Sequence, residues 1–274
     1  LFLYEDELND AGIELKNACC VRKKFLDKYN DGKSPRPYFA VLHADGDSMG
    51  ATLKAIDAEV EHFSFSKTLG DFSKAVKGIV EEHCGAPVFA GGDDVVALLP
   101  VDTALACAKE LHDKFSQMVK GPTLTVGVAF CPTENNLQDC VHFAKKLESE
   151  GKKLPGKDAL AIGARVRSGS DLIVCGSWKS DLYERFRSVL DLYLNKEIPR
   201  GFFADVAELV RLTDGWKEGG YDTEAMNKEF CRIRKRKEPK PPESILESFN
   251  LEALRQLHAM LKMGHFLTRS GEEA

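Results

Sequence analysis

The sequence has 274 residues, 43% hydrophobic and 30% charged, with a formal net charge of −5. This composition is typical of a globular protein and excludes collagen-like, mucin-like and wholly disordered chains, and the acidic balance argues against a general nucleic-acid coat. No apolar run approaches the roughly 20 residues that span a bilayer, and the start shows neither a signal peptide nor an initiator Met. We therefore expect a cytoplasmic chain that is a fragment or a processed product and has no membrane partner. The eight cysteines form no CxxC pair, which predicts reduced thiols.

The first part of the chain predicts a lead-in, one strand and two helices. Residues 1–36 are polar and end in the turn-rich NDGKSPRP. The apolar run YFAVLHA (38–44) predicts a buried central strand that stops at DGDSMG. A helical segment follows it. A second helix is indicated by apolar residues at spacings of four and three: Phe65, Leu69, Phe72, Val76 and Ile79.

The next segment predicts a hairpin and then alternating helices and strands. GAPVFA and VVALLP flank Gly91-Gly92-Asp93-Asp94, where glycine supplies the positive φ angles of a tight turn. Further elements are expected over 103–119 (with Asp102 as N-cap), 124–130, 135–151 and 158–166. This order describes a ferredoxin-like sheet with helices on one face.

From about residue 181 the pattern predicts helices only, over 181–194, 201–216 and 251–267, with RIRKRKEPKPPES (232–244) as a solvated charged loop. The fold class is therefore α+β, a ferredoxin-like domain followed by a small all-α domain. We divide the chain into a lead-in (1–36), a sheet domain (37–175) and a helical domain (176–274).

Two acidic pairs are the main candidates for chemistry. Asp45 and Asp47 follow the first strand, and Asp93 and Asp94 lie at the hairpin tip. The predicted topology brings both pairs to one sheet edge, where their repulsion calls for divalent cations, and hard oxygen ligands suit Mg²⁺ or Mn²⁺. Gly46 leaves its carbonyl accessible as a further ligand. For either motif alone, a helix cap or a polar turn is the alternative interpretation.

These residues carry a family resemblance. YFAVLHADGDSMG, FAGGDDVVALLP and LTVGVAF, with the helix CVHFAKKLESEGKKLPGKDALAI, resemble the catalytic Palm domain of the large subunit of type III CRISPR effector complexes, closest to subtype III-B. The resemblance covers about residues 36–175, and the helical tail also suits the family. GGDEF diguanylate cyclases and class III nucleotide cyclases share this palm, but here the signature ends in Asp-Asp-Val.

The resemblance implies a nucleotidyltransferase that converts ATP to cyclic oligoadenylate when the effector complex binds target RNA. It implies as partners ATP, other effector subunits, guide RNA and target RNA. Asp45, Asp93 and Asp94 would be catalytic and, with the Gly46 carbonyl, would hold two Mg²⁺ or Mn²⁺ ions. Nucleotide-contacting positions would be Gly46, Asp47, Ser48, Gly91, Gly92, Lys145 and Lys157. Lys146, Lys152 and Lys153 are further local cations for the triphosphate, but Lys145 is the first choice, against the alternative of a solvated helix face.

Several parts of the family's full-length subunit have no counterpart in this sequence: an HD nuclease domain, a first palm and a zinc module. The dipeptide His112-Asp113 falls within an amphipathic helix without partner histidines, and we interpret it as chance. Because the family places two ATP molecules between two palms, this chain alone is predicted to bind nucleotide without cyclising it efficiently. Two alternatives stay open: a diguanylate cyclase-like or other nucleotidyl cyclase, and a non-catalytic nucleotide-binding scaffold.

Overall fold

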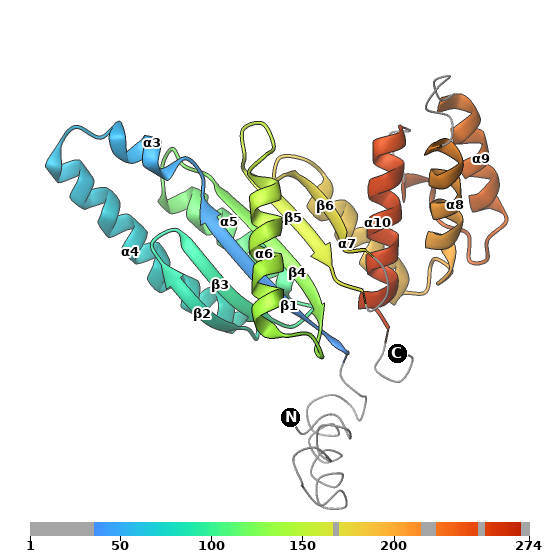
Figure 1. Cartoon of the computed structure of the whole chain (residues 1–274), viewed down its shortest axis with the longest axis horizontal. Helices are drawn as coiled ribbons and strands as arrows, with labels where there is room; N and C mark the ends of the chain where they lie inside the picture. Colours follow the sequence, from blue (N-terminus) through green and yellow to red (C-terminus); the bar gives the residue numbers. More distant parts are fainter. Residues whose placement is uncertain (1–35, 167–169, 215–222, 246–249, 270–274) are drawn as a thin grey trace, which may run out of the picture. The chain divides into compact units, whose positions relative to one another are not determined.

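The computed structural model describes residues 36–166, 170–214, 223–245 and 250–269 (Figure 1). Residues 38–266 form one compact unit. Among the described residues, no helix combines the length and apolar character needed to cross a membrane. The predicted lead-in, apart from Arg36, lies outside the described residues.

The centre of this unit is a six-stranded sheet with the order β2-β3-β1-β4-β5-β6. Neighbours among β2, β3, β1 and β4 are all antiparallel, which is the ferredoxin-like arrangement that the sequence predicts. β5 then extends the sheet parallel to β4, and β6 pairs antiparallel with β5. The strands are β1 (Tyr38–Gly46), β2 (Ala86–Gly91), β3 (Asp94–Leu99), β4 (Leu124–Pro132), β5 (Ala159–Ala164) and β6 (Leu172–Ser177).

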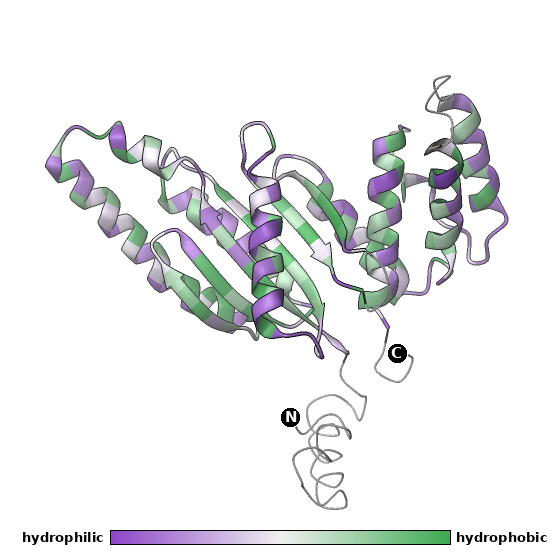
Figure 2. Ribbon diagram, viewed as in Figure 1, coloured by the Kyte–Doolittle hydropathy of each residue, from purple (hydrophilic) through white to green (hydrophobic). Residues whose placement is uncertain are grey.

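Strand burial follows position in the sheet. β4 is buried along its whole length and β1 from Ala40 to Ala44, because both of their faces are covered, and this is why they are almost continuously apolar. Figure 2 shows these central strands as predominantly hydrophobic. β2 is an edge strand with mostly exposed residues, and it contains Pro87 next to a register shift, as expected where no further strand needs the missing N–H.

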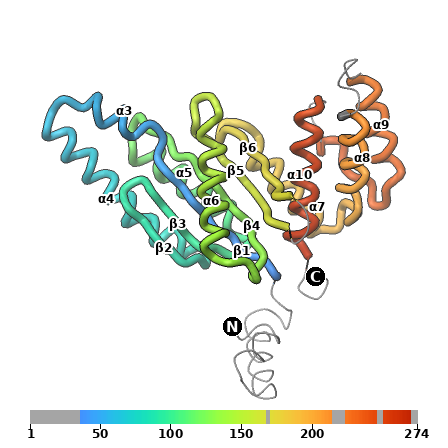
Figure 3. Tube along the Cα trace, viewed as in Figure 1, coloured from blue at the N-terminus to red at the C-terminus, as the bar shows by residue number. Residues whose placement is uncertain are grey.

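Helices cover both faces of the sheet, so the prediction of helices on one face was wrong. α6 (Leu137–Gly151) packs its buried side chains on Val41, Ala129 and Ala161, and it crosses the sheet in front of β1 and β4 (Figures 1 and 3). On the other face, α4 (Glu59–Glu82) meets α5 (Ala104–Met118) through the rings of Phe72 and Phe115, 5.0 Å apart. The α5 helix begins after Thr103 rather than after Asp102. The short α3 (Met49–Lys54) follows β1.

Two glycines let α6 approach the sheet closely. A Cβ built on Gly127 of β4 would lie 2.5 Å from the Ala144 carbonyl oxygen and 2.6 Å from the Glu148 backbone nitrogen. A Cβ on Gly163 of β5 would meet the side chains of Leu147 and Phe143 at 2.8 Å. The α6 backbone therefore rests almost directly on β4, and this close contact determines where the last turn of α6 ends.

The chain after β6 is helical, with α7 (Leu182–Leu194), α8 (Phe202–Asp214), α9 (Thr223–Lys235), a short 3-10 turn (Glu243–Ile245) and α10 (Leu251–Leu267). Neither β6 nor α9 was predicted. The segment predicted as a charged loop begins inside α9, where Arg234 is buried, donates to the Pro241 carbonyl at 2.9 Å and pairs with Glu243. The division between residues 175 and 176 stays a prediction.

The close contact between α6 and β4 predicts that Gly127→Ala destabilises the protein. The added methyl group would clash with the backbone of α6, which cannot move aside as a flexible side chain can. We therefore expect a loss of about 1–3 kcal/mol in the free energy of unfolding. Urea unfolding followed by circular dichroism measures this loss.

Gly78→Ala is the matched control, because a Cβ on Gly78 in α4 meets nothing within 4 Å. The control is expected to stabilise the helix by about 0.5–1 kcal/mol. Equal effects of the two substitutions would contradict the packing argument.

Candidate active site

The strand pairing brings the two acidic motifs together. Ala44 pairs with Val95, so Asp45 at the end of β1 lies beside Asp94 at the start of β3. Gly92 adopts a φ of +66° in the hairpin turn, as the sequence predicts for glycine at that position. Gly46 packs directly against Asp93, because a Cβ there would lie 2.6 Å from the Asp93 Oδ2. Asp45, Gly46, Asp93 and Asp94 therefore share one edge of the sheet.

The crowding of these carboxylates is visible in their electrostatics. Burial raises the pKa of Asp93, and the charges of Asp45 and Asp94 raise it further, although a backbone hydrogen bond and Lys152 act in the opposite direction. Asp94 Oδ1 is buried without a hydrogen bond and lies 3.8 Å from His43 Nε2. Burial lowers the pKa of His43, so a neutral imidazole faces Asp94 near neutral pH. The site thus concentrates negative charge that the protein only partly compensates.

Lys152 supplies most of that compensation. Its ammonium group donates to Asp45 Oδ2, lies 3.5 Å from the Gly46 carbonyl oxygen and pairs with Glu148 Oε1 at 2.8 Å. Although burial opposes it, the hydrogen bonds to Asp45 and Glu148 hold the pKa of Lys152 above its ordinary value. The cation therefore already contacts the two oxygen donors that β1 was predicted to offer a metal.

Sequence reasoning underrated Lys152 and missed Glu148. Glu148 is buried, and its only signal in the sequence is the spacing of four residues to Lys152, which places both side chains on one side of the last turn of α6. Lys145, the first choice, is exposed on α6, and its charge contributes to the lowered pKa of His43.

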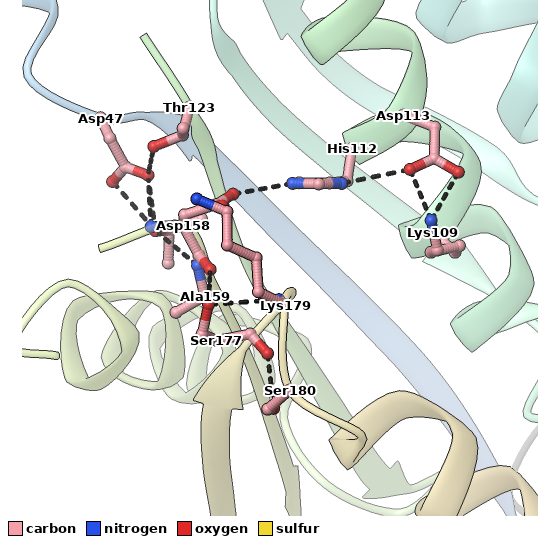
Figure 4. Close-up of polar contacts among 11 residues, drawn as sticks. Asp47, Lys109, His112, Asp113, Thr123, Asp158, Ala159, Ser177, Lys179 and Ser180 are labelled. Atoms are coloured by element: carbon pink, nitrogen blue, oxygen red, sulfur yellow. Dashed lines mark hydrogen bonds and ion pairs between the residues drawn. The ribbon is translucent and has the colours of Figure 1, made fainter. Parts of the chain in front are cut away.

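The structure buries Asp47, which was predicted as a position that contacts the nucleotide. Asp47 is 2% exposed, and its oxygens accept hydrogen bonds from Thr123 Oγ1 (2.7 Å), Thr125 Oγ1 (2.9 Å) and the backbone N–H of Asp158 (3.1 Å). Figure 4 shows the Asp47 carboxylate directed at Thr123 and at the backbone of Asp158. It joins the end of β1 to the start of β4 and to the loop before β5, so it supports the site from inside the protein.

The other predicted contacts lie around the same edge. Ser48 has a left-handed backbone with a φ of 58°, and its hydroxyl lies 3.5 Å from the Lys157 ammonium. Gly91 pairs with Asp94 across the hairpin, and the Phe89 ring covers it. Space around Gly92 is open, since a Cβ there would meet nothing within 4 Å. A ligand at the hairpin can therefore reach the backbone of Gly92.

The donor types suit a divalent cation. Among the described residues, however, no group of three or more His, Cys, Asp or Glu side chains is arranged so that it could hold a metal ion. The available donors are carboxylate and carbonyl oxygens, which Mg²⁺ and Mn²⁺ prefer. The Lys152 ammonium contacts both Asp45 and the Gly46 carbonyl, so these two donors can converge on one positive charge. A metal ion that binds them has to displace this ammonium group.

Comparison with known proteins identifies a similar domain. A family model described as "Cas10/Cmr2, second palm domain" matches residues 38–161. Those residues therefore resemble the second palm domain of Cas10/Cmr2. The CRISPR system Cmr subunit Cmr2 of Pyrococcus furiosus is 28% identical over 238 residues, which make up 71% of this chain and 26% of that protein. The chain thus spans about a quarter of that relative.

Solved structures show the same palm fold. Csm1 of T. onnurineus superposes with a TM-score of 0.60 at 16% identity, covering 86% of this chain and 39% of that one. A Csm1-Csm4 cassette in complex with cA4 superposes with a TM-score of 0.56 at 14% identity, covering 85% and 37%. At these identities the likeness shows the fold alone.

The burial of Asp47 and the exposure of Asp45 predict opposite consequences of their removal. Asp47→Ala strips the acceptor from the buried Thr125 hydroxyl and the Asp158 N–H, so we expect at least about 2 kcal/mol less stability. Asp45→Ala leaves Lys152 paired with Glu148, so its effect should stay within about 1 kcal/mol. Chemical denaturation of both variants measures the difference, and equal losses would contradict the assignment.

The raised pKa of Asp93 predicts that its ionisation destabilises the metal-free fold. Asp93→Asn should raise the melting temperature by about 1–3 °C near neutral pH. The gain should shrink as the pH falls from the raised pKa toward that of an ordinary aspartate, where both the folded and unfolded wild type become protonated.

Scanning calorimetry with a chelator present measures both effects. Asp71→Asn is the control, because the partly exposed Asp71 is paired with Lys74 and has a lowered pKa, and its substitution should not stabilise the protein. A lower melting temperature for Asp93→Asn at neutral pH would contradict the prediction.

Proposed function

We propose that this palm converts ATP to cyclic oligoadenylate by forming 3′–5′ phosphodiester bonds at a site for two divalent cations. The observation that carries the proposal is the convergence of Asp45, the Gly46 carbonyl, Asp93 and Asp94 on one sheet edge, with a cation, Lys152, already between the first two. The match of residues 38–161 to the second palm domain of Cas10/Cmr2 supports it. So does the binding of cA4 by a structural neighbour, the Csm1-Csm4 cassette.

The metal ions, when bound, lower the pKa of the attacking 3′-hydroxyl and neutralise the charge that develops on the triphosphate. Asp45, Asp93 and Asp94 would hold them with carboxylate oxygens, and the Gly46 carbonyl would add a neutral donor. The open backbone at Gly92 would let the nucleotide approach the hairpin closely.

The lysines have separate tasks in this scheme. With Asp45 as a metal ligand, Lys152 would remain paired with the buried Glu148 and could direct its ammonium group to the triphosphate. Lys157 lies beside Ser48 at the end of β1, where it can contact the same phosphates. We keep Lys145 as an outer cation on α6. The attack would join the 3′-oxygen to the α-phosphorus, break the bond to the leaving pyrophosphate and transfer the hydroxyl proton to water.

We further propose that a second palm completes the site, since the chain spans 26% of the relative Cmr2. In the cytoplasm it would work with other type III effector subunits, a guide RNA and a target RNA. A non-catalytic nucleotide-binding scaffold is the second candidate function. The pairing of Lys152 with Asp45 favours it, because the lysine neutralises the carboxylate that catalysis requires.

Titration calorimetry with Mn²⁺ and ATP tests the site. The wild-type chain should bind the pair, and Asp93→Ala/Asp94→Ala should weaken binding at least about 10-fold, because the metal loses two of its carboxylates. Asp71→Ala, which removes a partly exposed carboxylate on α4, is the control and should bind as the wild type does. Unchanged binding by the double variant would overturn the metal site.

Product analysis separates the candidate functions. The effector complex is reconstituted with this palm, supplied with Mg²⁺, target RNA and either ATP or GTP, and its products are identified by mass spectrometry. Cyclic oligoadenylate from ATP that disappears in the double variant supports the proposal. Cyclic diguanylate from GTP would favour a diguanylate cyclase, and binding without any product would favour the scaffold.

A further inference from the structure

The loop between α6 and β5 contains an unusual backbone segment next to the candidate site. Gly156, Lys157 and Asp158 have φ angles of +82°, +55° and +48°, so three consecutive residues lie in the left-handed region. Two of the three carry side chains, which disfavour this region. Such a backbone persists only where its surroundings hold it in place. We call residues 156–158 the left-handed turn.

The main chain of Asp158 is held from two sides. Its N–H donates to Asp47 Oδ2 at 3.1 Å, which ties the turn to the end of β1. Its carbonyl accepts from the Trp178 N–H at 2.9 Å and from Ser177 Oγ at 3.2 Å, which ties the turn to the end of β6. The turn is therefore fixed between the strand that bears Asp45 and the strand at the far edge of the sheet.

The Asp158 side chain is held from a third side, by α5. Its Oδ1 lies 2.8 Å from His112 Nε2, and both side chains are nearly buried, 12% and 10% exposed. His112 Nδ1 lies 3.3 Å from Asp113 Oδ1, and Lys109 pairs with the same carboxylate. The His112 ring stacks on Trp178 with centroids 4.5 Å apart. Figure 4 shows this chain of contacts running from Lys109 through His112 to Asp158 and Asp47.

We propose that His112 is a positioning residue for the candidate nucleotide site. By fixing the Asp158 carboxylate it holds the left-handed turn, and the turn places Lys157 beside Ser48. His112 itself does not reach the acidic cluster and acts through the turn. The inference rests on the proposed function for its consequence at the nucleotide, but the placement of the turn can be measured without any ligand. The dipeptide His112-Asp113 was interpreted from the sequence as chance, and this proposal assigns its histidine a structural role.

Two substitutions separate the hydrogen bond of His112 from its packing. His112→Phe keeps a ring that can stack on Trp178 but has no donor for Asp158, whereas His112→Gln keeps an amide donor. His142→Ala, at an exposed position of α6, is the control. If His112→Phe fails to fold, His112→Ala in the same assay replaces it, with His112→Gln as the rescue.

Hydrogen exchange of the ligand-free chain decides the positioning. The Asp158 and Ala159 amides should exchange roughly 10-fold faster in His112→Phe, with little change in the centre of β4, and His112→Gln should restore part of the protection. The His142→Ala variant should match the wild type. Unchanged exchange at Asp158 in folded His112→Phe would overturn the inference.

A double-mutant cycle with Lys157→Met tests the consequence for nucleotide, with binding of Mn²⁺ and ATP as the readout. His112→Phe should weaken binding about 3–10-fold in the wild type and have no further effect in the Lys157→Met background, because both changes then remove the same contact. Fully additive losses would show a general structural effect and would overturn the link to Lys157. If the wild type binds no nucleotide, the proposed function fails, and the exchange experiment still decides the placement of the turn.

Discussion

The repulsion among carboxylates at the ends of β1 and β3 is the constraint on which the site depends. Asp45, Asp93 and Asp94 are brought together by strand pairing, and partial burial makes their mutual repulsion stronger than it would be in water. Lys152 relieves part of it, anchored by the buried Glu148. The end of α6 has to lie where its lysine reaches Asp45, and the glycines under that helix permit this.

Two aspartates separated by one glycine have different tasks because their surroundings differ. Asp45 is partly exposed, so a ligand that displaces Lys152 can reach its carboxylate. Asp47 is buried among hydroxyl and amide donors, so its charge is used within the protein. It connects β1, β4 and the left-handed turn. The candidate site is thus an exposed layer of carboxylates supported by a buried layer of hydrogen bonds.

Most of the fold could be predicted from local patterns. Continuous apolar runs indicated β1 and β4, because a strand that is buried on both faces needs apolar residues throughout. Glycines with aspartates indicated the β2–β3 hairpin, because a tight turn needs residues that adopt positive φ angles. The strand β6 was missed because it is a short strand at the sheet edge, with only part of its residues buried. The helix α9 was missed because its basic residues resemble a solvated loop, although Arg234 is buried.

The sequence by itself determined the acidic motifs, the hairpin that carries one of them and the resemblance to a palm domain, since these depend on residue type and short spacing. Only the tertiary structure decided which lysine meets Asp45, that Asp47 turns inward, that helices cover both faces, and that His112 reaches Asp158. These outcomes depend on contacts between residues far apart in the chain, such as Lys152 with Asp45 and His112 with Asp158. Local periodicity does not record such contacts, because they arise only when the sheet and its helices pack together.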